Sequence, residues 1–209
     1  MIKYKTVIKE AEVEQIIDKS RFIGHVKPVE SREEAEEFIL EIRGLHKSAT
    51  HNVPAFVIGE QFQLQWASDD GEPQGTSGAP MVQMLVKEGI TNLVLVITRY
   101  YGGIKLGTGG LVRAYTGTAK LALEAGEICE VKELDELKVR LDYTFYGKLQ
   151  NLSLNNNFEV GNAVFEDAVV ANLVMEPENK EEIKTMLSNL TGGKALILGE
   201  IRRLAKVKP

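Results

Sequence analysis

The chain has 209 residues, of which 44% are hydrophobic and 26% are charged, and its formal net charge is −5. These values are typical of a globular protein with one large or two small domains, and they exclude a disordered or collagen-like chain. The excess of acidic residues also excludes a wholly basic nucleic-acid coat protein.

Strand and helix signals alternate over the first two thirds of the chain. Ser31 and Glu34 have the spacing of a capping box, in which each side chain accepts a hydrogen bond from the backbone near the other, and this predicts a helix start. Gly126 is the expected C-cap of a later helix. In chain order, we expect strands within 5–29, a helix from 31 to about 44, strands at 53–58 and 62–66, a helix at 80–88, a strand at 93–98 and a helix at 111–125.

The pattern changes beyond about residue 131. The expected elements there are a strand at 134–141, a helix at 143–155, strands at 158–165 and 168–175, a helix at 177–190 and a strand at 195–204. This β-α-β-β-α-β order is that of the ferredoxin-like fold. We therefore predict an α+β protein of two domains, 1–132 and 133–209.

Cysteine and histidine usage limits the possible sites. The only cysteine, Cys129, allows no internal disulfide and no cysteine metal cluster. Three histidines do not favour a histidine-rich metal site, and we expect no metal and no cofactor. No apolar stretch is long enough for a signal sequence or a membrane span. We expect a cytoplasmic protein without membrane association, a monomer or a weak dimer.

Two glycine-rich loops, 68–80 and 99–113, lie between a predicted strand and a predicted helix. Backbone N–H groups converge on anions at such places, helped by the helix dipole. Neither loop is a nucleotide-hydrolase motif, because Thr108 occupies the position of the P-loop lysine and Val112 that of the last glycine of GxGxxG.

The first loop carries three carboxylates, Asp69, Asp70 and Glu72. They could hold Mg²⁺ or act as acid and base. Alternatively, they cap backbone N–H groups in a turn with Gly71 at positive φ. The candidate acidic site is completed by Gln74, Thr76 and Ser77.

The second loop belongs to a stretch, 89–123, that contains no acidic residue. Cations, tyrosines and exposed glycine backbone suit phosphate or single-stranded RNA. Alternatively, the tyrosines pack into the core and the cations pair with the acidic loop. The candidate ligand or RNA-binding residues are Arg99, Tyr100, Tyr101, Gly102, Gly103, Lys105, Gly107, Thr108, Gly109, Gly110 and Arg113.

Two histidines, His46 and His51, flank a short polar segment beside Asn52. With the loop carboxylates they could act as general bases or ligands. Alternatively, they are hydrogen-bonded structural groups.

The segments 69–80 and 99–107, with 19–24 before them, resemble the signature of the IMPACT/YigZ family, and the C-terminal half favours its bacterial YigZ and YvyE branch. This resemblance implies an N-terminal α/β sandwich similar to domain IV of elongation factor G and to ribosomal proteins. The eukaryotic relatives act in translational control but have an additional partner-binding domain.

The leading hypothesis is a non-enzymatic, translation-associated module that binds RNA or a ribosomal surface through Arg99, Lys105 and Arg113. One alternative is a metal-dependent enzyme, with Mg²⁺ at the three loop carboxylates and a phosphorylated small molecule or nucleotide as substrate. The other is a protein–protein adaptor that uses the ferredoxin-like sheet.

Overall fold

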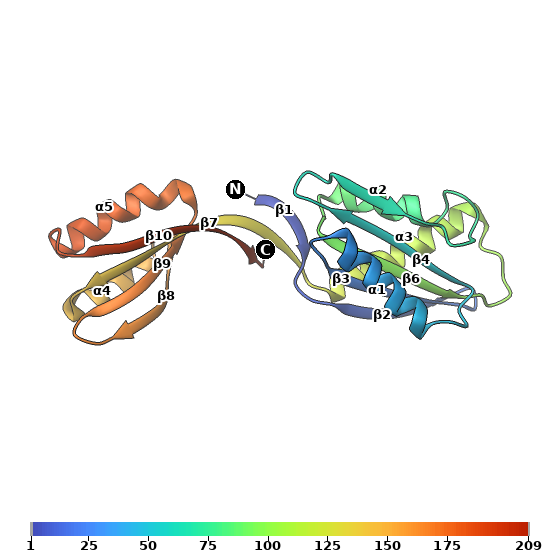
Figure 1. Ribbon diagram of the computed structural model, residues 1–209, viewed down its shortest axis with the longest axis horizontal. Helices are drawn as coiled ribbons and strands as arrows, with labels where there is room; N and C mark the ends of the chain where they lie inside the picture. Colours follow the sequence, from blue (N-terminus) through green and yellow to red (C-terminus); the bar gives the residue numbers. More distant parts are fainter. Residues whose placement is uncertain (1, 209) are drawn as a thin grey trace. The chain divides into compact units, whose positions relative to one another are not determined.

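The computed structural model describes residues 2–208 and confirms a two-domain α+β architecture (Figure 1). Residues 4–130 make up most of one compact unit, and residues 131–206 make up most of the other. Each unit has its own hydrophobic core. No helix among the described residues has both the length and the apolar character needed to cross a bilayer.

The N-terminal unit is built on an antiparallel sheet in the order β2-β3-β6-β4-β5. The apolar run expected at 93–98 forms the central strand, because it is flanked by two strands on each side. The elements of the sheet are β2 (Ala11–Ile17), β3 (Ser20–Pro28), β6 (Leu93–Tyr100), β4 (His51–Ile58) and β5 (Leu64–Ala67).

Helices cover both faces of this sheet (Figure 1). Alternate residues of β6 point to opposite faces. Leu93, Leu95 and Ile97 join the core under α2 (Gly78–Glu88) and α3 (Gly107–Ala125), whereas Val94 and Val96 join the core under α1 (Arg32–Leu45). The sheet therefore has an α2/α3 face and an α1 face.

The start of α1 confirms the predicted cap. Ser31 Oγ accepts a hydrogen bond from the backbone N–H of Glu34 at 3.2 Å, and a Glu34 carboxylate oxygen accepts one from the backbone N–H of Glu30 at 2.8 Å. The return bond thus reaches one residue further back than in the standard capping box.

Two details around α3 differ from the prediction. The helix begins at Gly107 rather than at residue 111, so residues 107–110, which were expected in the loop, form its first turn. Gly126 is the C-cap, but its φ is −72°, and the left-handed residue is Glu127. The space at position 126 is tight, because a Cβ there would lie 3.0 Å from a Val26 methyl group and 3.1 Å from one of Val7.

The second unit has the predicted ferredoxin-like order, with β10 and β9 on either side of β7 and β8 outside β9. Leu137, Val139 and Leu173 lie in its core. The expected boundary between residues 132 and 133 falls inside one strand, β7. The elements are β7 (Ile128–Leu141), α4 (Tyr143–Ser153), β8 (Phe158–Phe165), β9 (Val169–Met175), a short 3₁₀ turn (Pro177–Asn179), α5 (Lys180–Thr191) and β10 (Leu196–Val207); the N-terminal strand β1 (Ile2–Val7) also pairs with β7.

The only tryptophan of the chain belongs to the N-terminal unit. Trp66 lies on the edge strand β5, directly opposite Phe56 of β4. The two rings stack with their centroids 5.4 Å apart, and the tryptophan remains 38% exposed.

Candidate functional site

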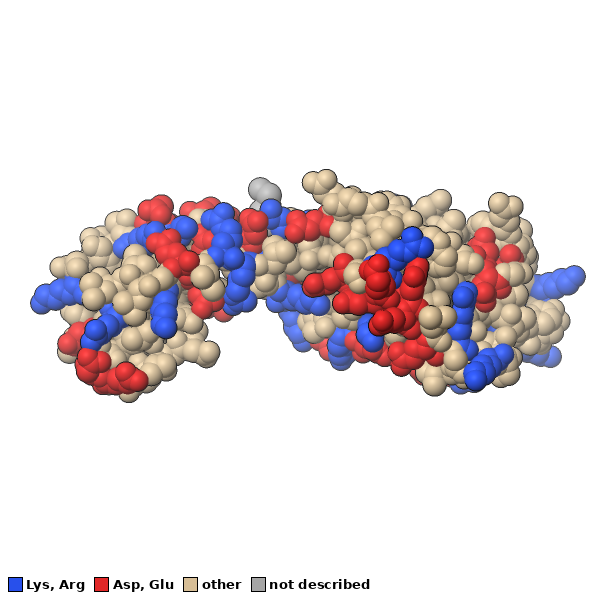
Figure 2. All heavy atoms as spheres, viewed as in Figure 1, with Lys and Arg blue, Asp and Glu red and all other residues tan. Residues whose placement is uncertain are grey.

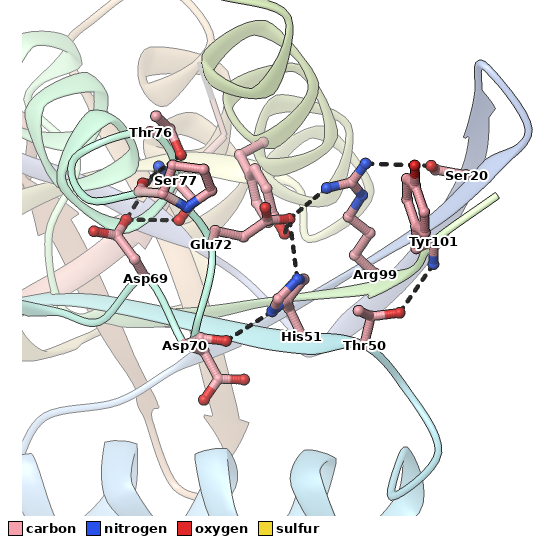
Figure 3. A network of polar contacts seen from close by, with 12 residues as sticks. Ser20, Thr50, His51, Asp69, Asp70, Glu72, Thr76, Ser77, Arg99 and Tyr101 are labelled. Carbon is pink, nitrogen blue, oxygen red and sulfur yellow. Dashed lines mark hydrogen bonds and ion pairs between the residues drawn. The ribbon is translucent and has the colours of Figure 1, made fainter. Parts of the chain in front are cut away.

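The two glycine-rich loops meet at Glu72, on the α2/α3 face of the sheet (Figure 3). Its side chain is only 4% exposed. One carboxylate oxygen accepts hydrogen bonds from Arg99 Nη1 at 2.6 Å and from the Tyr115 hydroxyl at 2.7 Å. Burial, and then the hydrogen bond to Glu72, raise the pKa of Tyr115 well above its usual range, so this phenol stays protonated as a donor.

Arg99 is the last but one residue of β6, and it is 4% exposed. The guanidinium lies over the rings of Phe22 and Tyr101, 5.3 Å from each centroid, and Nη2 donates to Ser20 Oγ at 3.3 Å. Its Nε–H is a buried group without a hydrogen-bond partner among the described residues. Arg99 therefore forms a buried ion pair with the acidic loop, which is the pairing that the alternative interpretation of the second loop describes.

His51 faces the same cluster because it lies directly opposite Arg99 in the sheet. Its Nδ1 lies 2.8 Å from the backbone carbonyl oxygen of Asp70, which can only accept, so Nδ1 carries the proton. The other ring nitrogen, Nε2, lies 3.8 Å from a Glu72 carboxylate oxygen.

The Asp70 carboxylate is held by two partners. It accepts hydrogen bonds from the backbone N–H of Asn52 at 2.7 Å and from Arg43 at 3.0 Å. The backbone φ of Asp70 is +47°, and that of Gly71 is +87°. The predicted positive φ at Gly71 is therefore confirmed, and the preceding residue shares it.

Asp69 organises the start of α2. Its carboxylate accepts hydrogen bonds from the Ser77 hydroxyl and from the backbone N–H groups of Gly75, Ser77 and Gly78, at 2.6 to 3.1 Å. Burial raises its pKa, but these hydrogen bonds outweigh burial and hold the pKa below its usual value. Thr76 donates its hydroxyl proton to the Pro73 carbonyl within the same loop, and Gln74 is exposed.

The three loop carboxylates therefore have separate partners and do not converge on one point. Asp69 binds backbone N–H groups, Asp70 binds Asn52 and Arg43, and Glu72 binds Arg99 and Tyr115. Asp69 and Asp70 accept hydrogen bonds from backbone N–H groups, as the capping interpretation expects, whereas Glu72 binds two side chains. This geometry does not favour a shared Mg²⁺ ion.

A pocket of about 480 Å³ opens beside this cluster. It is a size typical of small-ligand sites. Glu72, Arg99 and His51 form its floor from the sheet side, and the second loop with the start of α3 forms the other wall. From that wall come Tyr101, Lys105, Leu106, Gly107, Thr108 and Leu111, while Thr50 and Pro73 complete the lining.

The start of α3 is open toward this pocket. No side chain caps the helix, its N-cap position is Leu106, and its first turn holds no acidic residue. The first backbone N–H groups of an α-helix have no partner within the helix. Gly109 and Gly110 extend the exposed backbone, and the exposed Arg113 lies one turn further along. The start of α3 is therefore electropositive and rich in N–H donors.

Positions 102 and 103 favour glycine for two different reasons. A Cβ on Gly102 would lie 2.0 Å from the backbone of Lys19, so only glycine fits there. Gly103 has open space around it but a φ of +88°. The backbone N–H of Gly102 also donates to Ser20, and that of Tyr101 donates to Thr50.

Tyr100 and His46 belong to the opposite, α1 face. Tyr100 follows Arg99 on the same strand, so its side chain points to the other side of the sheet. Its hydroxyl lies 3.0 Å from His46 Nδ1, and Arg21 lies over its ring. The predicted set of binding residues is therefore divided between two faces, and His46 and His51 lie in different environments.

His25, which no sequence pattern singled out, lies beside His46, with the ring centroids 5.1 Å apart. It is 2% exposed. Burial, and then the nearby His46, lower the pKa of His25 to about 4. Sequence reasoning also missed Ser20, Thr50 and Tyr115, because each reaches the cluster only through long-range contacts.

Comparisons with known proteins cover most of the chain. The family model of the Impact N-terminal domain matches residues 18–123, and that of a domain of unknown function, DUF1949, matches residues 139–194. The chain is 39% identical to "IMPACT family member YvyE" of Bacillus subtilis, over 97% of this chain and 94% of that protein. It is 32% identical to "IMPACT family member YigZ" of Escherichia coli, over 92% and 93%.

The similarity to a mammalian relative is limited to part of the chain. "Protein IMPACT" of Mus musculus is 34% identical over 43% of this chain and 29% of its own length. A crystal structure described as that of a hypothetical protein matches the fold with a TM-score of 0.59 at 30% identity, covering 95% of this chain and 98% of that one.

Proposed function

The chain belongs to the IMPACT family, and we propose that its N-terminal domain binds phosphate groups of RNA, which makes the protein a translation-associated binding module rather than an enzyme. The observation that carries this proposal is the open N-terminus of α3, which faces the pocket beside Lys105 and Arg99. The translational setting comes from the family resemblance.

Charge distribution supports this choice of surface. Acidic side chains gather over α1 on the face drawn in Figure 2. A phosphate backbone is repelled by such a surface. The start of α3 has the opposite character, because residues 89–123 contain no Asp or Glu. The acidic residues of α1 are Glu33, Glu34, Glu36, Glu37 and Glu41.

The roles within the site follow from exposure. Lys105 and Arg113 are exposed and free to move toward phosphate oxygens. Tyr101 is 46% exposed, which leaves a ring face for a base. Arg99 is held at the pocket by Glu72, and its Nε–H has no partner among the described residues. Phosphate contact therefore falls to Lys105, Arg113 and the backbone N–H groups of α3.

The test is co-sedimentation of the purified protein with ribosomes, together with titration of fluorescent single-stranded RNA at several salt concentrations. The variant is Lys105→Ala/Arg113→Ala. The control is Lys120→Ala, which removes a cation from the same helix about 20 Å from its start. Each lost phosphate contact should lower the salt slope of RNA binding by about 0.7. Unchanged affinity and slope in the double variant would exclude this surface.

A second candidate, the protein–protein adaptor, is favoured by exposed apolar side chains on β10. Leu196, Leu198 and Ile201 are each at least 50% exposed, although they are large and aliphatic. Clusters of this kind mark interaction surfaces. Leu198→Lys/Ile201→Lys would abolish ribosome association without changing affinity for isolated RNA if the adaptor function holds.

The metal-dependent enzyme remains a hypothesis that this arrangement does not favour. The three carboxylates at 69, 70 and 72 are each saturated by different donors. A catalytic Mg²⁺ needs carboxylate oxygens that converge on one point.

A further inference from the structure

A second cluster of chemically active groups lies on the α1 face, away from the pocket. Glu12 on β2, His25 on β3 and His46 at the C-cap of α1 each offer one ligand atom, and these atoms all lie within 4.8 Å of one another. Glu12 and His25 are direct partners in the sheet register, so the strand pairing itself brings carboxylate and imidazole together.

A hydrogen-bond chain places an acceptor beside one ring nitrogen of His25. Asn52 donates from Nδ2 to the His46 carbonyl at 3.3 Å, which turns its Oδ1 toward Thr98. The Thr98 hydroxyl donates to that oxygen at 2.7 Å, which leaves the hydroxyl oxygen as an acceptor 3.5 Å from His25 Nε2. When Nε2 carries the proton and faces Thr98, the lone pair of Nδ1 is available to a metal ion.

His25 Nδ1 faces a carboxylate, with Glu12 Oε2 at 3.3 Å. This contact is stabilised by a proton on Nδ1 or by a metal cation that takes the place of that proton. Two ligands of one tetrahedral zinc ion, each about 2.05 Å from the metal, lie about 3.3 Å apart. The pair already has the spacing of two metal ligands.

His46 is supported in the same way. Its Nδ1 lies 3.0 Å from the Tyr100 hydroxyl, which leaves Nε2 available as a ligand. Histidine ligands of metals usually donate their second ring N–H to an oxygen acceptor, which fixes the orientation of the ring. Thr98 and Tyr100 lie two residues apart on β6 and point to the same, α1 face. The Thr98 hydroxyl is the oxygen partner of His25, and the Tyr100 hydroxyl is that of His46.

Exposure and charge allow a cation to enter. His25 is buried, His46 is half-buried, and the Glu12 side chain is 65% exposed, so the cluster opens to solvent on the carboxylate side. The surrounding face is acidic, because α1 holds five acidic residues and only Arg32 and Arg43 as basic ones. The two cations on β3 are both paired with acidic residues of β2 or its start, Arg21 with Glu14 and Lys27 with Glu10.

We propose that Glu12, His25 and His46 form a binding site for a divalent first-row transition metal, with zinc as the best-matched ion. Two imidazoles and one carboxylate are a common ligand set for zinc, and a fourth position stays open for water. The sequence did not favour a histidine metal site, because the three ligands are separated by 13 and 21 residues and only the fold brings them together.

The test uses the full chain, freed of any tag and of metal by chelation. Calorimetric titration with Zn²⁺ should show one equivalent bound, and Co²⁺ should give visible d–d absorption. Glu12→Gln and His46→Gln should each lower the affinity at least tenfold. Tyr100→Phe should lower it about tenfold through the orientation of His46. All of these side chains except His25 are at least partly exposed, so the variants should keep the fold.

The matched control is Glu14→Gln, which removes a carboxylate from the same strand and the same face. Its affinity for Zn²⁺ should equal that of the unaltered chain. Circular dichroism of each variant checks that the fold is retained. The proposal is overturned if millimolar Zn²⁺ does not bind, or if Glu12→Gln and His46→Gln bind as tightly as the control. Because the site lies on the opposite face from the pocket, neither result bears on RNA binding.

Discussion

Glu72 and Arg99 form a buried ion pair, 2.6 Å between Oε1 and Nη1, that joins the acidic and basic loops into one unit. Both side chains are about 5% exposed or less. The two loops that carry most of the chemistry in the sequence are therefore held together by mutual neutralisation. This arrangement sets the shape of the pocket floor while leaving the pocket wall at α3 free.

Removing one partner of this ion pair should destabilise the folded protein. We expect Glu72→Gln to lower the free energy of unfolding by about 3–5 kcal/mol, because the Arg99 charge then stays buried without a counter-charge. Urea unfolding followed by Trp66 fluorescence measures the change. The double variant Glu72→Leu/Arg99→Met should lose much less. If both variants lose the same free energy of unfolding, the destabilisation does not come from the unpaired Arg99 charge.

Glycines in the second loop should differ in their response to substitution. Gly102→Ala should destabilise the N-terminal domain, because its Cβ would lie 2.0 Å from the Lys19 backbone. Gly109→Ala should stabilise it by up to about 1 kcal/mol, because alanine favours the helix and its Cβ meets only the end of Arg113. Thermal unfolding compares the two. The same Gly109→Ala protein should bind RNA more weakly if ligand approaches the backbone there.

Stability of the metal-free protein should rise with pH between about 4 and 6.5. The pKa of His25 is lowered to about 4 in the folded state by burial and by His46, while an unfolded histidine titrates near 6.5. In this window the unfolded chain binds the additional proton, so folding is favoured as pH increases. Glu12 is the acidic group that faces His25.

Denaturant unfolding of the chelated protein at pH 4.5, 5.5 and 6.5 measures this dependence. A His25→Asn variant should lose most of the slope, whatever its absolute stability. A slope that persists in the variant would assign it to other groups.

The sequence predicted the framework better than the site. The apolar run 93–98 identified the central strand, and periodicity alone identified the β-α-β-β-α-β order of the second domain. Such signals are local. The burial of Arg99 depends on Glu72 and Tyr115, which are 27 and 16 residues away. No local sequence pattern predicts contacts over such separations.

Strand alternation explains the remaining differences. The basic loop was expected to begin at Arg99, but β6 continues through Arg99 to Tyr100, and the side chains of these two additional strand residues point to opposite faces. Glu12 and His25 could be paired only by locating the tight turn at Asp18 and Lys19. These residues have φ of +45° and +63°, although neither is a glycine, so the turn gave no sequence signal.

The position of Trp66 has a practical consequence for every experiment on stability. Because the chain has one tryptophan and it lies on an edge strand of the N-terminal unit, its fluorescence reports the unfolding of that unit alone. Far-ultraviolet circular dichroism reports both units. Two superimposable transitions would show that the units unfold as one cooperative system, whereas two separate midpoints would give each unit its own stability from a single sample.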